Sequence, residues 1–182
     1  MDNLDQKVSI KVGIIGEDAY EQHSDSGLTM AQLGAIHEFG ATIKVTPKMR
    51  AYLHYKGIHL KDSTTTITIP ARSFLRDTFF TGDAKERLMD FAGLSENAEF
   101  NKEFVEYKLI TDPNFFYKIC QAIGAQALQM VQDSFRAGGY PTLWQPISSI
   151  TRKNRKGDPN NPPLNDTGAL MDSISVEVKR IQ

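Results

Sequence analysis

The sequence is poor in the features that mark several large classes of protein. Its 182 residues contain a single cysteine, Cys120, which excludes an internal disulfide and favours a reducing compartment. No apolar run approaches the roughly 18 residues that a membrane-spanning helix needs, and the polar, acidic start of the chain is unlike a signal peptide. The formal net charge of -1 provides no overall field that would favour nucleic acid or an acidic membrane.

Motifs for catalysis and cofactor binding are also missing. Gly13 and Gly16 lack the spacing of a dinucleotide fingerprint and of a P-loop, and a tight turn explains them. Cys120 falls on the apolar face of an expected helix, which is typical of core packing rather than of a reactive thiolate. No serine lies in a Gly-x-Ser-x-Gly elbow. We therefore expect no enzyme, no cofactor and no small-molecule substrate.

The histidines do not form a recognisable metal motif, because none is followed by a second histidine four residues later on the same helix. His54 and His59 flank an expected turn, and a chance metal site there stays open. The simpler interpretation is that they are surface or hydrogen-bonded side chains. The four histidines are His23, His37, His54 and His59.

Alternation and capping signals predict the elements of the N-terminal half. Apolar residues alternate over 8–14, which predicts a strand with one buried face. Thr29 and Gln32 form a capping box for a helix over 28–40, which Gly40 can close in a left-handed turn. Further strands are expected over 42–45, 50–55 and 64–69. Short helices are expected over 71–80 and from Asp83 to residue 91, where Asp83 and Glu86 form a second capping box.

A long amphipathic helix dominates the C-terminal half. Apolar residues recur at helical spacing from Pro113 to Arg136, with Asp112 as the expected cap and Pro113 in the first turn. Gly138 and its neighbour are placed to end this helix. Near the C-terminus, Asp166 or Thr167 can cap a short helix, and alternation over 174–178 predicts a last strand.

The order of these elements predicts an α+β fold in a single domain over residues 1–182. Strands come in a block between helices, which favours a mostly antiparallel sheet packed against the long helix and shorter helices. We expect the first and last strands to pair in that sheet, because each is half apolar and needs a partner to bury it.

Two segments stand outside this plan. Residues 81–112 are an expected acidic insertion, and within them 83–106 hold seven acidic and three basic residues, a local balance of -4. Residues 137–163 form an expected extended, basic, proline- and glycine-rich arm. Its tip, RKNRKGDPNN at 152–161, is predicted to be mobile until assembly. Trp144 is predicted to pin the arm to its own domain or to a neighbour.

Three pieces of sequence together resemble the tail-completion and virion-morphogenesis proteins of tailed bacteriophages, which are neck or minor tail components. They are IHEFG at 36–40, IPARSFLR at 69–76, and the pair WQPISSITRKNRK at 144–156 with LNDTGALMDSI at 164–174. The matching positions are His37, Glu38, Phe39, Gly40, Pro70, Ala71, Arg72, Phe74, Arg76, Trp144, Pro146, Thr151, Leu164, Thr167, Gly168 and Leu170.

The resemblance implies a structural role in the virion. Such proteins sit at the head-proximal end of the tail, commonly as a six-fold ring, and prepare the tail to join the head after assembly in the host cytoplasm. The implied partners are other copies of the chain and neighbouring tail or neck proteins. The motif residues are expected to serve folding and subunit contact, with Trp144, Arg152, Lys153, Arg155 and Lys156 as candidate interface residues.

An alternative function uses the same basic tip. Arg152, Lys153, Arg155 and Lys156 place four positive charges within five residues, and such a run can contact DNA phosphates. The tip has no interleaved aromatic residues and no recognition helix behind it. Passing contact with DNA, docking on an acidic protein surface such as 83–106, and a solvated loop tip all stay open.

Overall fold

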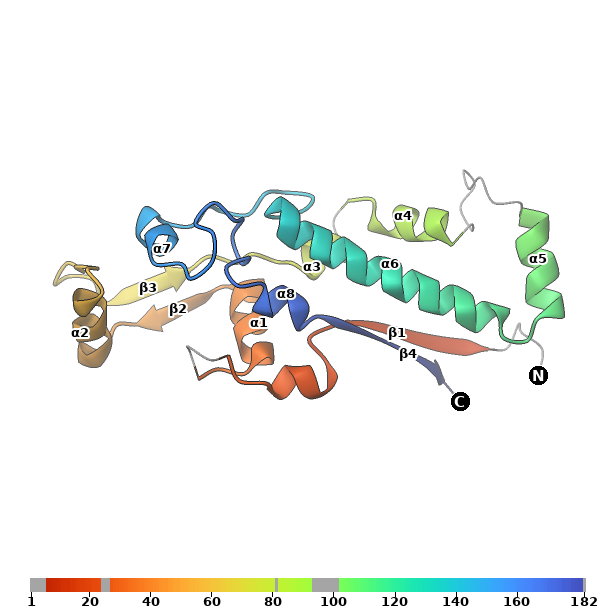
Figure 1. Cartoon of the computed structure of the whole chain (residues 1–182), viewed down its shortest axis with the longest axis horizontal. Coiled ribbons are helices and arrows are strands. Elements are labelled where there is room, and N and C mark those ends of the chain that lie inside the picture. The colour runs from red at the N-terminus through yellow and green to blue at the C-terminus, as the bar shows by residue number, and fades with distance from the viewer. Residues whose placement is uncertain (1–5, 24–26, 81, 93–101, 182) are drawn as a thin grey trace.

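Two short antiparallel sheets, set apart along the molecule, and one long helix organise the chain (Figure 1). The computed structural model describes all residues except 1–5, 24–26, 81, 93–101 and 182. The long helix, α6 (Phe115–Ala137), runs beside the sheet of β1 (Lys7–Gly13) and β4 (Ser175–Ile181), while the second sheet projects from the other half. The arrangement confirms the α+β class, but the strands form two separate sheets rather than one.

The first and last strands pair as expected. β1 and β4 run antiparallel, with Ile10 opposite Val178 and Val12 opposite Val176. These side chains lie on the face that packs against α6, where an added methyl group on Gly124 would lie only 2.9 Å from Val176 and 3.1 Å from Val178. The helix therefore approaches the sheet closely at this glycine, and the first and last strands pack together against it.

The capping box predicted for the first long helix is present. The helix α1 (Met30–Phe39) follows the 3-10 turn η2 (Gly16–Tyr20), and its cap Thr29 accepts a hydrogen bond from the Gln32 amide at 3.2 Å, while the Gln32 side chain accepts one from the Thr29 amide at 3.0 Å. Gly40 differs from the prediction, because its φ of 74° and ψ of 169° lead directly into the strand β2 (Ala41–Lys44) instead of a left-handed turn.

The predicted strand over 50–55 is wrong, because this segment is the helix α2 (Pro47–Tyr55). Thr46 caps it by accepting a hydrogen bond from the Met49 amide at 3.2 Å, and Pro47 occupies its first turn. Arg50 then donates to the carbonyl oxygens of Leu60 and Thr64, at 3.3 and 2.6 Å, and ties the helix to the strand that follows. That strand, β3 (Thr66–Ile69), pairs antiparallel with β2.

The helices after this hairpin depart from their predicted bounds. The short helix α3 (Arg76–Phe80) covers only the second half of 71–80. The helix α4 (Ala84–Phe91) begins at Asp83 without the predicted capping box, because Asp83 instead accepts a hydrogen bond from the Tyr140 hydroxyl at 2.7 Å. The predicted acidic insertion contains a further helix, α5 (Lys102–Thr111), which packs near the start of α6.

The start of α6 lies two residues after the predicted one. Asn114 is the capping residue, and Asp112 accepts a hydrogen bond from the Asn114 amide at 2.9 Å and pairs with Lys118 at 3.1 Å. The predicted end is confirmed, since Gly138 is left-handed with φ 80° and ψ 29°. Among the described residues, no helix has the length and apolar character to cross a membrane.

The main core lies where the C-terminal end of α6 meets the start of the arm and the segment 170–174. Phe135 packs against Phe74 and Trp144, with ring centroids 5.0 and 5.5 Å apart. The buried members of this cluster are Phe74, Val131, Phe135, Trp144, Leu170 and Ile174. Trp144 is therefore pinned to its own domain, which corrects its assignment as an interface residue, because only 7% of it is exposed for a neighbour.

The arm over 137–163 is irregular, as predicted, apart from the five-residue helix α7 (Ser149–Lys153), and it is folded onto its own chain. Arg155 donates to the carbonyl oxygens of Asn161 and Pro162, and the Gly157 amide donates to Asp166 at 2.7 Å. The short helix α8 (Ala169–Asp172) that follows is preceded by a left-handed Gly168, so neither predicted residue, Asp166 nor Thr167, is its cap.

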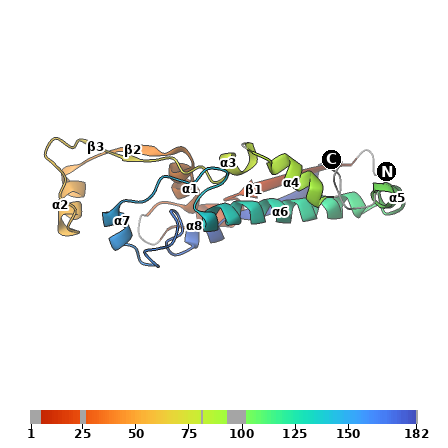
Figure 2. The same cartoon turned by 90° about the horizontal axis from the view of Figure 1, so that it is seen from above.

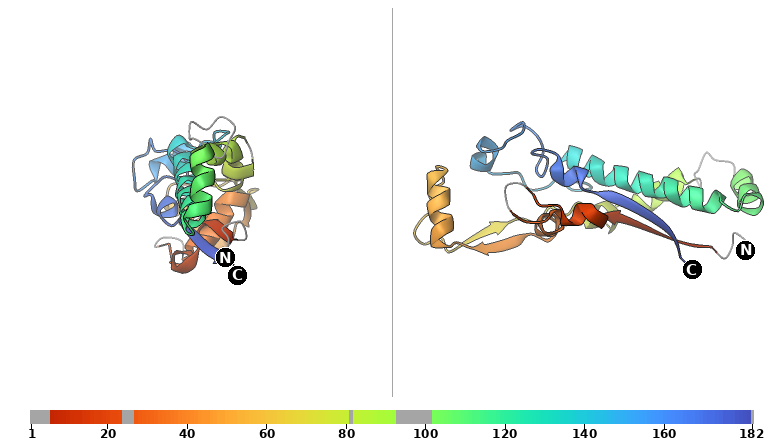
Figure 3. Two further views of the ribbon diagram at one scale, coloured as in Figure 1. Left: turned by 90° about the vertical axis from the view of Figure 1, so that its right-hand side faces the viewer. Right: turned by 60° about the horizontal axis from the view of Figure 1, so that its bottom comes forward.

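The molecule is elongated. The β2–β3 hairpin carries α2 at one end and α5 lies at the other, as the view from above also shows (Figure 2). Seen along its length, the molecule has a narrow cross-section, and turned about that axis it shows the hairpin projecting beyond the arm (Figure 3).

Candidate functional site

The end of α1 and the turn before α3 meet around one buried carboxylate. Glu38 is 3% exposed. Its side chain accepts hydrogen bonds from the Ser73 hydroxyl at 2.6 Å and from the backbone amides of Phe74, Leu75 and Arg76 at 2.8, 3.0 and 3.0 Å. Glu38 thus caps a helix that is distant in sequence, because the first amides of α3 have no partners within their own helix.

Arg76 completes this arrangement, which we call the Glu38 node (Glu38 with residues 72–76). The Arg76 guanidinium pairs with the Glu38 carboxylate at 3.1 Å, donates to the Glu38 carbonyl oxygen at 2.9 Å and lies over the Phe39 ring, 4.6 Å from its centroid. Burial alone would raise the pKa of Glu38, but the hydrogen bonds that its carboxylate receives hold the pKa below its usual value.

The arm joins the node from the other side. The Arg72 amide donates to the His37 carbonyl oxygen at 2.7 Å, and the Arg72 side chain donates through Nε to the Gln145 carbonyl oxygen at 3.1 Å. Trp144 donates through Nε1 to the Ser73 carbonyl oxygen at 3.3 Å. Three of the sequence pieces that carry the resemblance therefore meet here, although Arg72 and Gln145 are 73 positions apart.

Two further motif positions have conformational roles. Gly40 lies so close to the next segment that a Cβ would come within 2.9 Å of the Ala71 amide nitrogen and of the Ile69 carbonyl oxygen. Gly168 has φ 87°, and Leu170 after it is buried in the main core. Thr167 accepts a hydrogen bond from the Ala169 amide at 3.4 Å. These positions direct the backbone and offer no reactive group.

Not every motif residue faces the node. Phe39 is 64% exposed, and Ala71 is exposed as well. Pro70 follows β3 directly and ends that strand. The Phe39 ring lies beside the guanidinium of Arg76, and most of its surface is exposed.

A cavity of about 430 Å³ opens beside the node. The buried Arg72 and the partly buried Arg155 both line it, together with Asp166 and His37. Burial, and then the Arg72 charge, lower the pKa of His37 to about 4, so the imidazole is neutral at pH 7. The apolar part of the wall consists of Leu33, Ile58, Ile147, Leu164, Ala169 and Leu170.

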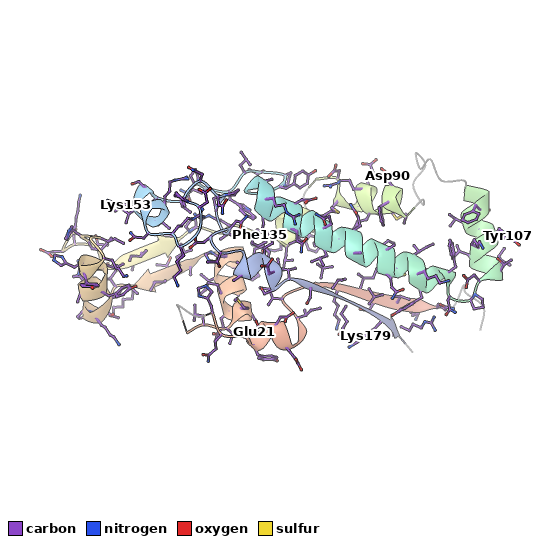
Figure 4. All side chains as sticks on the ribbon, in the orientation of Figure 1. Glu21, Asp90, Tyr107, Phe135, Lys153 and Lys179 are labelled. Atoms are coloured by element: carbon purple, nitrogen blue, oxygen red, sulfur yellow. The ribbon has the colours of Figure 1, made fainter. Side chains whose placement is uncertain are left out.

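The basic tip is not a free row of cations. Arg152 donates to the Pro159 carbonyl oxygen at 2.6 Å, and Arg155 donates to two further carbonyl oxygens, so both arginines fold the arm. Lys153 and Lys156 are exposed, and Figure 4 shows Lys153 on α7. Arg152 and Arg155, two of the predicted interface cations, therefore have structural roles within the chain.

The remaining reactive groups do not assemble into a site. Cys120 is buried, and burial raises the pKa of its thiol. His54 and His59 approach each other at 2.9 Å between their Nδ1 atoms on the exposed surface. In the part of the chain that the structure describes, no group of three or more histidine, cysteine or acidic residues is arranged to hold a metal ion.

Sequence reasoning placed Glu38 in a motif but missed its function as a cap for α3. One physical signal pointed to it, since a carboxylate in the last turn of a helix is unfavourable next to the negative end of the helix dipole and needs another partner. No local pattern in the sequence indicates the hydrogen bond from Ser73 to Glu38, because the two residues are distant in sequence. None indicates the hydrogen bond from the Gly157 amide to Asp166, because the donor is a backbone group. Comparison with known proteins adds no name, since the chain matches no family model, no curated protein and no solved structure.

Proposed function

We propose that this chain is a structural subunit of a tailed bacteriophage, a tail-completion or neck component at the head-proximal end of the tail that forms a ring and helps to join tail to head. The observation that carries the proposal is the Glu38 node. Residues of IHEFG, IPARSFLR and WQP, which carry the resemblance to that family, make direct hydrogen bonds to one another there. In a structural protein, we expect the motif residues to hold the fold together by contacts of this kind rather than to form a reactive site.

The distribution of exposed apolar side chains supports a role in assembly. Tyr55 on α2 is 85% exposed, and Ile110 on α5 is 82% exposed. These helices lie at opposite ends of the molecule, and Tyr107 marks the α5 end in Figure 4. A ring needs two different patches on each subunit that meet head to tail, and exposed apolar groups are typical of such contacts.

The proposed partners are other copies of this chain, in a hexameric ring, and neighbouring tail or neck proteins. The protein is assembled in the host cytoplasm and resides in the virion. DNA binding by the tip 152–156 is the weaker alternative, because Arg152 and Arg155 donate to backbone carbonyl oxygens of the arm and are not free to follow a row of phosphates.

Labelling the protein in particles tests this function. A peptide tag added at the N-terminus, detected with a gold-conjugated antibody by electron microscopy, should mark the junction between head and tail. The same tag on a major tail-tube protein serves as the control and should mark the whole tail. Label at the distal tail tip, or particles that contain none of the tagged protein, would contradict the proposal.

A further inference from the structure

Arg72 is a buried cation that has no anionic partner among the described residues. It is 6% exposed. Its side chain donates one hydrogen bond, from Nε to the Gln145 carbonyl oxygen, and among the described residues no carboxylate forms an ion pair with it. A buried charge without a partner is destabilising, so the position calls for an explanation beyond folding.

The neighbours of Arg72 in the cavity do not neutralise it. Arg155 adds a second positive charge, held in place by the carbonyl oxygens of Asn161 and Pro162. Asp166 is the one carboxylate among the lining residues, and it accepts hydrogen bonds from the amides of Gly157 and Lys156. The charges that line the cavity thus sum to one positive charge when histidine is neutral.

His37, which also lines the cavity, carries an unsatisfied polar atom. Its Nδ1 is buried and has no hydrogen-bond partner in the described part of the chain. Buried polar atoms are nearly always satisfied. A cavity lined by a guanidinium that has no carboxylate partner among the described residues has the chemistry of an oxyanion site, since a bound oxyanion would accept hydrogen bonds from the arginine.

We propose that this cavity receives the carboxylate of an acidic side chain, flanked by apolar residues, from a partner protein, and that Arg72 is its principal ligand. The proposal rests on the proposed function, because it names the partner chemistry of an assembling subunit. A carboxylate matches the planar guanidinium, and the apolar wall from Leu33, Ile147 and Leu164 suits the side chains on either side of it.

The shape of the site distinguishes this partner from DNA. A DNA backbone is bound by a row of exposed cations that follows successive phosphates. Here one guanidinium is recessed in a cavity of about 430 Å³, and the nearest second one is engaged with backbone carbonyl oxygens. That arrangement suits one inserted side chain, which brings apolar surface with its charge.

Blocked tripeptides provide a direct test on the free protein. Acetyl-Leu-Glu-Leu-amide, titrated into the labelled protein, should shift the Arg72 Nε–Hε nuclear magnetic resonance signal saturably. Its neutral match, acetyl-Leu-Gln-Leu-amide, should bind at least about tenfold more weakly, since a hydrogen bond to a charged group contributes about 1.5–3 kcal/mol. Inorganic phosphate and a short DNA duplex are titrated in parallel.

Two variants make the assignment specific. Arg72→Met should weaken binding of the glutamate peptide at least about tenfold, while its melting temperature stays equal or rises because an uncompensated buried charge is gone. Arg152→Met is the control, because Arg152 lies in the arm 137–163 and does not line the cavity. This variant should bind the glutamate peptide as tightly as the unmodified chain does.

Equal binding of the two peptides, undiminished binding to the Arg72→Met variant, or no response to any titrant would overturn the proposal. So would a stronger Arg72 response to phosphate or DNA, which would make the cavity a phosphate site. Because these titrations need no other phage protein, their failure leaves the proposed place in the virion untouched. A failed labelling experiment likewise leaves the tripeptide result standing.

Discussion

Glu38 is the residue on which the packing of α3 against α1 depends. Its carboxylate accepts hydrogen bonds from three backbone amides at the start of α3, and a glutamine there would turn an amide donor toward at least one of them. Glu38→Gln should therefore lower the free energy of unfolding by about 1.5–3 kcal/mol, the contribution typical of a hydrogen bond to a charged group. Urea denaturation followed by circular dichroism measures this change.

The control for that variant is Glu86→Gln on the exposed face of α4. Its effect should stay within about 0.5 kcal/mol, as is usual for surface substitutions. A Glu38→Gln protein as stable as the Glu86→Gln protein would show that the node contributes nothing to folding.

The buried His37 side chain should make the free energy of unfolding depend on pH. Its pKa of about 4 in the folded chain lies below the value near 6.5 expected when unfolded, so the unfolded state binds the proton more readily. The stabilisation is therefore fully present above pH 6.5 and is lost as pH falls toward 4. Between pH 7 and 5 the loss should be about 2 kcal/mol.

Replacing His37 with glutamine should remove that part of the slope, whereas His54→Gln, at an exposed histidine, should keep it. Urea denaturation at a series of pH values between 5 and 7 gives the comparison. The interval stays above the acidic region, near and below pH 4.5, in which protonation of Glu38 would add its own loss of stability. Equal slopes for the His37→Gln and unmodified proteins would contradict the buried, neutral imidazole.

At the scale of elements, the contact between α6 and the β1–β4 sheet depends on the absence of a side chain at Gly124. Gly124→Ala gains up to about 1 kcal/mol of helix propensity. The added methyl group would meet the stiff Val176 and Val178 side chains at 2.9 and 3.1 Å, and overpacking of this kind costs about 1–3 kcal/mol. We expect a net loss of unfolding free energy.

Thermal unfolding of Gly124→Ala beside Gln121→Ala, an exposed substitution on the same helix, measures this effect. Gly124→Ala should melt at a lower temperature than the unmodified chain. For Gln121→Ala, the free energy of unfolding should change by only about a few tenths of a kcal/mol. A Gly124→Ala protein with a raised melting temperature would mean that the sheet can move away from α6 without loss.

The elements that could be predicted from sequence are those specified by local patterns. The capping box of α1, the pairing of β1 with β4 and the end of α6 at Gly138 follow from periodicity and from glycine and threonine chemistry. The segment 50–55 is helical although its aromatic residues favour a strand, because Thr46 and Pro47 start a helix just before it.

The site was predictable only in part. The motif residues around Glu38 could be chosen from sequence, but their mutual contacts could not, since they join segments separated by more than 30 positions. Arg72 gave no local signal of being buried and unpaired, because that condition depends on where the arm returns. The sequence allowed Trp144 to pack either on its own domain or on a neighbour. Tertiary packing places it in its own core.

At the scale of the whole molecule, the shape suits a subunit that contacts neighbours at both ends. The hairpin with α2 and the exposed face of α5 lie far apart along the long axis, and each presents apolar side chains. Contacts between unlike ends close into rings or continue as filaments, and a ring is what the proposed place at the end of a tail requires.

The most direct measurement of that central claim is electron microscopy of particles assembled without this protein. The proposal predicts finished, DNA-filled heads beside complete but unjoined tails, and restoration of joined particles when the purified chain is added. Joined, infectious virions in its absence would contradict it.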